Sequence, residues 1–374
     1  MMRCGFLALL TFGTGCQLLF TEQLANDASL GDGPRDANGD APETLIDAPS
    51  AANFVFITKD TYNGNLGGIV GADAKCQASA NRPQATFIAV LGYQNSSLYT
   101  ALKVLDASRA WYRTDGELVA DSPIEFTSGL RSPVIFDQNG QRIIDNVTIW
   151  TGFDNTGALQ GNDCFAWSSA ASSASGGFGQ SDNRPIALGG SVSTCNLQRH
   201  LLCASIGATK PPVLRMPVAN RMFVSGLVSL GPTDSGLAAL DDICQNEANQ
   251  AQLKRSDGTA AQFVALLSTS SQSAIVRSGL NPNVDYVRVD GARIGQLNAV
   301  PRTYIHLTAN GGLADTIDVW TGGIPTTTSL LACFDWTSST PTGTFGSNNR
   351  ASNAAYDTMA GSCSSKKRVY CVEK

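Results

Sequence analysis

Eight of the ten cysteines form two sets of four with nearly the same spacing, and this pattern constrains the fold more than any other feature of the chain. The steps within the first set are 88, 31 and 8 residues, and those within the second are 89, 30 and 8. Such agreement indicates an internal repeat, in which one structural unit is used twice. The members are Cys76, Cys164, Cys195 and Cys203 in the first set and Cys244, Cys333, Cys363 and Cys371 in the second.

Aromatic landmarks repeat together with the cysteines. The Trp-Thr-Gly motif at 150–152 recurs at 320–322, and the Cys-Phe-x-Trp motif at 164–167 recurs at 333–336. Domains of roughly 150 residues bury enough surface for a core. We therefore predict two domains joined by a spacer that contains three prolines, with the boundaries 53–207, 208–219 and 220–374.

Four cysteines in each unit, in a chain with a secretory signal, predict two disulfides per domain. Pairing within each unit leaves nine combinations open. The alternative is a zinc ion bound by four cysteines, but the long first steps lack the Cys-x-x-Cys pairs that such sites use.

Residues 1–16 carry Arg3, then a short apolar run, then small residues before Cys16. This order is typical of a secretory signal, and the apolar run is too short to span a bilayer. The Gly-Cys junction resembles a bacterial lipoprotein signal, so we expect Cys16 to be lipidated; a plain cleaved signal with an incidental cysteine is the alternative. Residues 17–52 are rich in Asp, Ala, Gly and Pro, and we expect a disordered acidic linker.

The local pattern predicts a mixed α+β fold, with helices early in each unit and a loop-rich antiparallel part later. Helices are expected at 72–80, 237–251 and 270–277, the last with a serine cap. Strands are expected at 54–58, 87–91, 147–150, 200–203, 222–225, 263–267, 318–320 and 368–372.

A helix cysteine, a Trp-Thr-Gly motif, a Cys-x-x-Trp motif and two closing cysteines resemble the C-type lectin-like fold, and its endostatin branch most closely. The opening at 63–77 is similar to lectin-like domains of bacterial surface lipoproteins. The resemblance implies tandem lectin-like domains with nested disulfides, in which the tryptophans are core residues. The implied pairs are Cys76–Cys203, Cys164–Cys195, Cys244–Cys371 and Cys333–Cys363, and the implied core tryptophans are Trp150, Trp167, Trp320 and Trp336.

The sequence lacks the triplets with which C-type lectins bind calcium and sugar, namely Glu-Pro-Asn or Gln-Pro-Asp together with Trp-Asn-Asp. Oxygen ligands for calcium are still offered in the first unit by Asp154, Asn155, Asn162 and Asp163. The matching loop of the second unit, 323–332, has no carboxylate. We therefore expect no tight metal site and no cofactor, and a solvated polar loop in the first unit.

The histidines His200 and His306 are not shared between the units, and no Gly-x-Ser-x-Gly element is present. Disulfide bonding removes the paired cysteines as nucleophiles. A net charge of −5 argues against nucleic-acid binding, and the one compact basic run, 366–368, is expected to be a solvated strand end. We expect no enzymatic activity.

Together these features predict a non-catalytic surface or extracellular bacterial protein, lipid-anchored, that binds a glycan or protein without calcium. The expected ligand-binding regions are the Gly-, Ser- and Asn-rich loops at 153–163, 171–185, 323–332 and 338–353. The alternatives are a structural surface protein without a small ligand and, less favoured, a hydrolase.

Overall fold

The computed structural model describes residues 52–81, 85–94, 109–144, 147–206, 219–230, 236–255, 257–315 and 317–374. The predicted signal with Cys16, the acidic linker at 17–52 and the Pro-rich spacer at 208–219 lie almost wholly outside these residues. Among the described residues no helix is long and apolar enough to cross a membrane. The described residues all belong to one compact unit of the chain.

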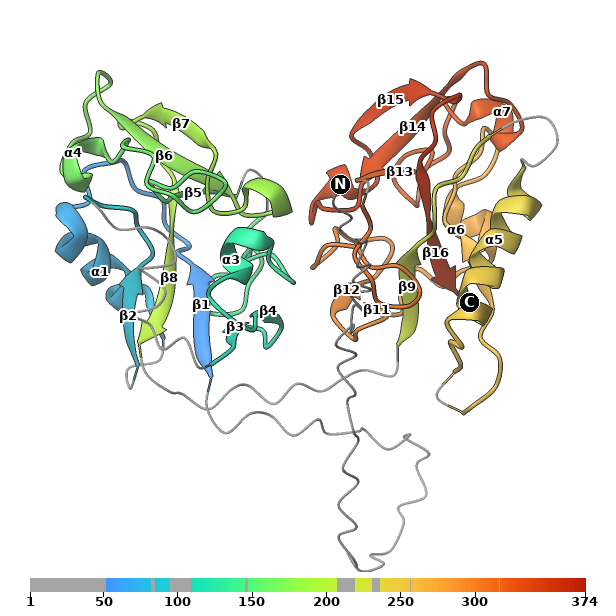
Figure 1. Ribbon diagram of the computed structural model, residues 1–374, viewed down its shortest axis with the longest axis horizontal. Coiled ribbons are helices and arrows are strands. Elements are labelled where there is room, and N and C mark those ends of the chain that lie inside the picture. Colours follow the sequence, from blue (N-terminus) through green and yellow to red (C-terminus); the bar gives the residue numbers. More distant parts are fainter. Residues whose placement is uncertain are drawn as a thin grey trace, which may run out of the picture. The chain divides into compact units, whose positions relative to one another are not determined.

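Two similar mixed sheets of eight strands each form the framework (Figure 1). The strand order is β4-β3-β1-β8-β5-β6-β7 in the first repeat and β12-β11-β9-β16-β13-β14-β15 in the second, with β2 and β10 added to β8 and β16. The first repeat contains β1 (Asn53–Ile57), α1 (Gly68–Ser79), β2 (Thr86–Ala89), β3 (Trp111–Arg113), β4 (Leu118–Ala120), α3 (Glu125–Ser128), β5 (Thr148–Trp150), α4 (Cys164–Trp167), β6 (Ser175–Gln180), η1 (Arg184–Ile186), β7 (Ser191–Thr194) and β8 (His200–Ile206).

The second repeat follows the same order from strand to strand. It contains β9 (Asn220–Val224), α5 (Leu237–Gln250), β10 (Phe263–Ala265), α6 (Ala274–Ser278), β11 (Tyr286–Arg288), β12 (Arg293–Gly295), β13 (Asp318–Trp320), α7 (Cys333–Trp336), β14 (Thr342–Ser347), η2 (Asn353–Ala355), β15 (Met359–Ser362) and β16 (Arg368–Glu373).

Both faces of each sheet are covered, which explains why β1 is apolar at four consecutive positions, 54–57, rather than alternating. In β1, Phe54 and Phe56 belong to one hydrophobic cluster, whereas Val55 and Ile57 belong to another. Successive side chains of a strand point to opposite faces, so β1 supplies both cores at once.

The sequence prediction of a mixed α+β fold is confirmed, but three of its details are wrong. The sheets are not purely antiparallel, because β1 pairs with β3 and β5 pairs with β8 in parallel. Helix α1 begins at Gly68, four residues before the expected start. The helix expected at 270–277 is only α6, which begins after Ser273, whose side chain accepts a hydrogen bond from the Val276 amide.

The four disulfides form the nested pairs that the family resemblance implies. The outer bridge of each repeat joins the long helix to the last strand, and the inner bridge joins the Cys-Phe-x-Trp segment to the loop before that strand. The pairs are Cys76–Cys203, Cys164–Cys195, Cys244–Cys371 and Cys333–Cys363, with Cα–Cα distances of 5.5, 5.7, 5.3 and 5.8 Å.

In α5 the residues Leu240, Cys244 and Ala248 are buried at a spacing of four residues. This spacing places them on one face of the helix, against the sheet. Helix α1 buries Ala72 and Cys76 in the same way. The outer disulfide therefore extends an apolar contact that the helix already makes.

Candidate functional site

The Cys-Phe-x-Trp segments, α4 and α7, are left-handed turns rather than ordinary helices. Four consecutive residues in each segment have positive φ, and none of them is glycine. The φ values are 51, 55, 54 and 60° for Cys164, Phe165, Ala166 and Trp167, and 50, 49, 50 and 67° for Cys333, Phe334, Asp335 and Trp336. Non-glycine residues rarely enter this region, and then normally one at a time.

Backbone hydrogen bonds close both turns in the same way. The Trp167 amide donates to the Asp163 carbonyl at 2.6 Å, and the Trp336 amide donates to the Ala332 carbonyl at 2.7 Å. Each left-handed non-glycine residue costs roughly 1–2 kcal/mol. A strained conformation of this kind persists only where the surrounding structure enforces it, and such strain is concentrated at functional sites.

Buried anchors at both ends enforce the turns. Trp167 and Trp336 have no exposed surface, and their indole nitrogens donate to the carbonyls of Gly92 at 2.8 Å and Ser268 at 2.9 Å. At the other end, Cys164 and Cys333 are held by the inner disulfides. All four tryptophans expected in the core are fully buried, and each turn tryptophan packs against the tryptophan of the Trp-Thr-Gly motif.

A glycine in the neighbouring strand of each repeat makes room for the inner disulfide. A Cβ atom on Gly176 would stand 2.6 Å from the Sγ atom of Cys164, and one on Gly343 would stand 2.5 Å from that of Cys333. Real Cβ atoms do not approach so closely, so both strands need glycine at this point.

Local hydrogen bonds at the two turns differ. In the first repeat the Asp163 side chain accepts from the Ala166 amide at 3.0 Å. In the second repeat Asp335 lies inside the turn, and its carboxylate accepts from the amide of Ser270 at 2.8 Å and from its hydroxyl at 3.0 Å. The same conformation is thus supported by different residues in the two repeats.

The turns expose one aromatic side chain each while burying their neighbours. Phe165 is 70% exposed and Phe334 is 71% exposed, whereas the flanking cysteine and tryptophan side chains are buried. Two further apolar side chains are exposed nearby. Val70 belongs to α1, a helix that contacts α4, and Leu330 lies just before α7. Figure 1 shows α4 and α7 at the outer edge of their repeats. Each turn is thus a rigid mount for an exposed phenylalanine.

The polar oxygens of the acidic loop in the first repeat accept hydrogen bonds from the loop and from the adjacent strand β6. One carboxylate oxygen of Asp154 accepts hydrogen bonds from the amides of Thr156 and Ala158, at 2.8 and 2.9 Å, and the Asn162 side-chain oxygen accepts from Ser175 at 2.6 Å. Among the described residues no three His, Cys, Asp or Glu side chains gather as a metal-binding group. These oxygens shape the loop itself.

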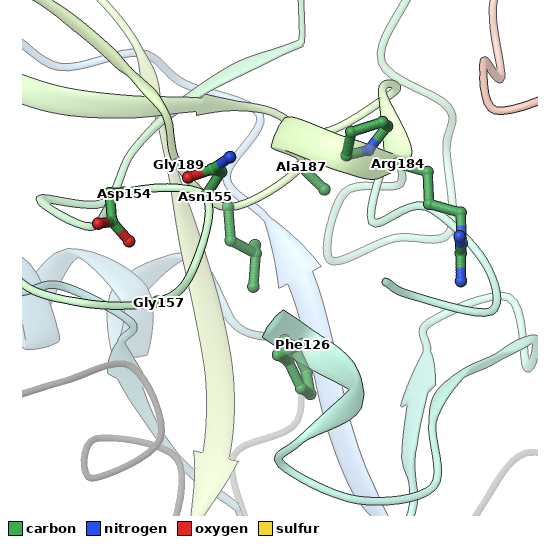
Figure 2. A pocket seen from close by; sticks show the side chains of 9 residues that line it. Phe126, Asp154, Asn155, Gly157, Arg184, Ala187 and Gly189 are labelled. Carbon is green, nitrogen blue, oxygen red and sulfur yellow. The ribbon is translucent and has the colours of Figure 1, made fainter. Parts of the chain in front are cut away.

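A small cavity lies behind this loop, between Phe126, Asn155 and Arg184. Figure 2 shows Asp154 and Arg184 on opposite sides of it. About 10 Å³ of it is open to the centre of a water-sized sphere, which is room for about one water molecule. The cavity therefore has no room for a glycan or peptide group.

The two histidines, His200 and His306, are both buried. His200 Nδ1 lies 2.7 Å from the Thr58 carbonyl oxygen, and Arg368, its counterpart in the second repeat, donates to the matching carbonyl of Ser225. Burial lowers the pKa of His200. Burial and the neighbouring Arg288 lower the pKa of His306 well below its ordinary value. Among the described residues, the side-chain hydrogen bonds of the two histidines involve the Thr58 carbonyl and the Arg288 guanidinium, respectively.

The basic run at 366–368 is only in part the solvated strand end that the sequence predicts, because Lys366 is exposed whereas the next two residues are buried. Lys367 is 8% exposed and donates to Asp318 at 2.5 Å, with its ammonium 3.9 Å from the centre of the Phe345 ring. Arg368 is 6% exposed and pairs with Asp315. Buried cations with such partners support the fold, and the aromatic stacking of Lys367 was hidden from sequence analysis because Phe345 lies on another strand.

The disulfides indicate the environment of the protein, and one comparison relates part of the chain to a protein family. Four disulfides indicate an oxidising environment, at a cell surface or outside the cell. Residues 59–184, about a third of the chain, match the model of a family described as "Protein of unknown function (DUF1554)". The matched segment includes α4 and therefore the first left-handed turn. No curated protein matches the chain.

From the sequence alone, the Cys-Phe-x-Trp motif is expected only to supply core residues. The exposed phenylalanine inside it was missed, because a residue between a buried cysteine and a buried tryptophan gives no periodic signal. The sequence gives one indication of this side chain. Phenylalanine follows the cysteine of the motif in both repeats, at 165 and 334, although the buried cysteine and tryptophan do not themselves require an aromatic residue there.

Proposed function

We propose that the protein is a non-catalytic extracellular binding protein that contacts a glycan or protein ligand through its two left-handed turns, without calcium. The observation that carries this proposal is the repeated display of Phe165 and Phe334 on strained, disulfide-anchored turns. We further propose that the two repeats are lectin-like domains, in keeping with the cysteine and tryptophan pattern.

Physical reasoning favours binding over a purely structural role for these phenylalanines. Exposing an aromatic ring to water does not stabilise the fold, and the left-handed turn that carries the ring costs conformational free energy. Rigid aromatic side chains stack on sugar rings or fill pockets of protein partners, and they lose little conformational entropy on binding. A rigid mount adds to this advantage, because less motion remains to be frozen.

The double variant Phe165→Ala/Phe334→Ala is expected to lose at least tenfold in affinity, since truncating an aromatic hot spot costs 2 kcal/mol or more. Its unfolding free energy should stay within about 0.5 kcal/mol of the original, because both rings are exposed. The measurement is binding to a glycan array, with calcium and with chelator, alongside a pull-down from an extracellular extract followed by titration of each ligand found.

The matched control is Ile144→Ala/Leu313→Ala, which removes two exposed apolar side chains away from the turns. This control should bind as the original chain does. Equal binding by the phenylalanine variant and the control, or ligand binding that requires calcium, contradicts the proposal.

We also propose that Cys16 anchors the protein to a bacterial membrane through lipid. Cys16→Ser is then expected to move the protein from the membrane fraction to the soluble fraction. Stable anchoring needs more than one acyl chain, and the variant has no cysteine at position 16 to carry any. Fractionation followed by mass analysis of the N-terminal peptide measures both the partition and the lipid. Unchanged partitioning with an unmodified peptide means that secretion is not followed by lipid anchoring at this residue.

A further inference from the structure

Two equivalent arginines reach across from one repeat to the other. Arg113 ends β3 and Arg288 ends β11. The Nη1 atom of Arg113 donates to the carbonyl of Arg302 at 2.7 Å, and that of Arg288 donates to the carbonyl of Arg131, also at 2.7 Å. Each of these nitrogens also donates to a carbonyl of its own repeat, that of Pro133 at 3.0 Å for Arg113 and that of Tyr304 at 3.2 Å for Arg288. The two bonds are therefore reciprocal.

Residues that correspond to each other in the two repeats also meet directly. Ser132 and Thr303, which follow Arg131 and Arg302, have their hydroxyl oxygens 3.1 Å apart. Asn183 and Arg350, each the third residue after β6 or β14, form an antiparallel bridge. Two backbone hydrogen bonds of 2.9 Å flank this bridge, from Arg184 to Asn349 and from Ala351 to Asp182.

Contacts of this kind define a pseudo-twofold axis. In an isologous interface residue i contacts residue j and j contacts i, and a residue on the axis meets its own counterpart. Ser132 with Thr303 and Asn183 with Arg350 are two such axial pairs. Exchanging the two repeats thus maps these contacts onto themselves.

The contact region is buried and its charges are paired. Arg113 has no exposed side-chain surface and forms a two-bond pair with Asp115, at 2.8 and 2.9 Å. Arg302 donates to the same carboxylate from the other repeat at 2.8 Å. Burial raises the pKa of Asp115, but the two arginines outweigh it and hold the pKa below its ordinary value. The guanidinium groups of Arg113 and Arg302 both lie close to the Phe136 ring, at 4.3 and 4.6 Å from its centroid.

Apolar packing also crosses the axis. Tyr304 and Ala351 of the second repeat have no exposed surface and belong to the hydrophobic cluster of the first repeat. The Tyr304 hydroxyl donates to the Ser181 carbonyl at 3.1 Å. A fully buried tyrosine needs such a partner for its hydroxyl, and here the other repeat supplies it.

We propose that the two repeats bind each other through this surface, so that one chain contains a built-in isologous pair. The pairing surface comprises, in the first repeat, Arg113, Asp115, Arg131, Ser132, Ser181 and 182–184, and its counterpart in the second. Unlike repeats fit best: two second repeats would bring Arg350 against Arg350, and two first repeats would have Pro133 where Tyr304 donates its hydroxyl. Within the loops at 171–185 and 338–353, which are expected from sequence to bind ligand, residues 182–184 contact residues 349–351.

A cysteine pair on the axis tests this pairing in the full chain. Ser132→Cys/Thr303→Cys places two thiols where hydroxyls are 3.1 Å apart, close enough for a disulfide after small adjustments. On oxidation we expect a single cross-linked species that migrates as a monomer in non-reducing electrophoresis. Mass mapping should join the peptides that contain positions 132 and 303, with the four native disulfides intact.

The matched control is Ser132→Cys/Ser364→Cys, in which the second cysteine occupies an exposed site away from the pairing surface. It should form the intramolecular cross-link at least tenfold more slowly. Equal cross-linking rates in the two variants, or a disulfide-linked dimer of chains in place of the monomer, overturn the proposal. None of these measurements involves a ligand. The result therefore tests the pairing of the repeats independently of the proposal that the left-handed turns bind a ligand.

Discussion

Replacing Cys76 and Cys203 together by alanine is expected to lower the free energy of unfolding of the first repeat by about 5 kcal/mol. The bridge closes a loop of 127 residues, and the entropy that a cross-link removes from the unfolded chain grows with loop length. The inner pair, Cys164 and Cys195, closes 31 residues and is expected to contribute about 3.5 kcal/mol on the same basis. Urea denaturation of the full chain, followed by mass analysis to locate the unfolded repeat, measures both effects.

Binding should respond in the opposite order. The inner bridge anchors the strained turn at Cys164, so its removal should release that turn and weaken ligand binding while the repeat stays folded. The outer-pair variant should bind normally as long as it is folded. A matched comparison is Cys244→Ala/Cys371→Ala, which opens a loop of the same 127 residues in the second repeat. A greater loss of stability from the inner pair than from the outer pair contradicts the loop-length argument.

Trp167→Ala is expected to cost 3–5 kcal/mol of stability in the first repeat, the usual range for truncating a buried aromatic. The change removes a fully buried ring, its contact with Trp150, and the hydrogen bond to the Gly92 carbonyl. Because that tryptophan also anchors the C-terminal end of α4, the turn should relax to ordinary negative φ values. Thermal unfolding, together with near-ultraviolet circular dichroism, measures the loss of stability and of aromatic packing.

Trp111→Ala is the control for this variant. Trp111 is equally buried, but it lies on β3 in the other hydrophobic cluster of the repeat. Its truncation should cost a similar free energy and leave the binding of the folded protein unchanged. If both variants bind equally well, Trp167 contributes to the core alone and the turn does not depend on it.

Pairing of the repeats would change how such turns are used. Two sites held at one spacing engage a ligand that carries two copies of its recognition element more strongly than either site does alone. A flexible spacer between independent domains allows this only over a range of separations. The sequence predicts only that a Pro-rich spacer at 208–219 joins the domains, whereas the proposed pairing surface would hold them at one spacing.

The sequence by itself determined the repeat, the mixed fold class, the position of the cysteines in the long helices, and the four tryptophans of the core. These features are encoded locally or by spacing: cysteine positions recur, and apolar runs and helix formers report their own elements. The left-handed turns, the burial of Lys367 and Arg368, and the pairing surface were decided only by the tertiary structure. Each of them depends on residues far apart in the chain. The strained turn in α4 forms because the disulfide at Cys164 and the hydrogen bond from Trp167 to a distant carbonyl fix its two ends. Lys367 is buried because Asp318 and the Phe345 ring, on other strands, interact with its ammonium group.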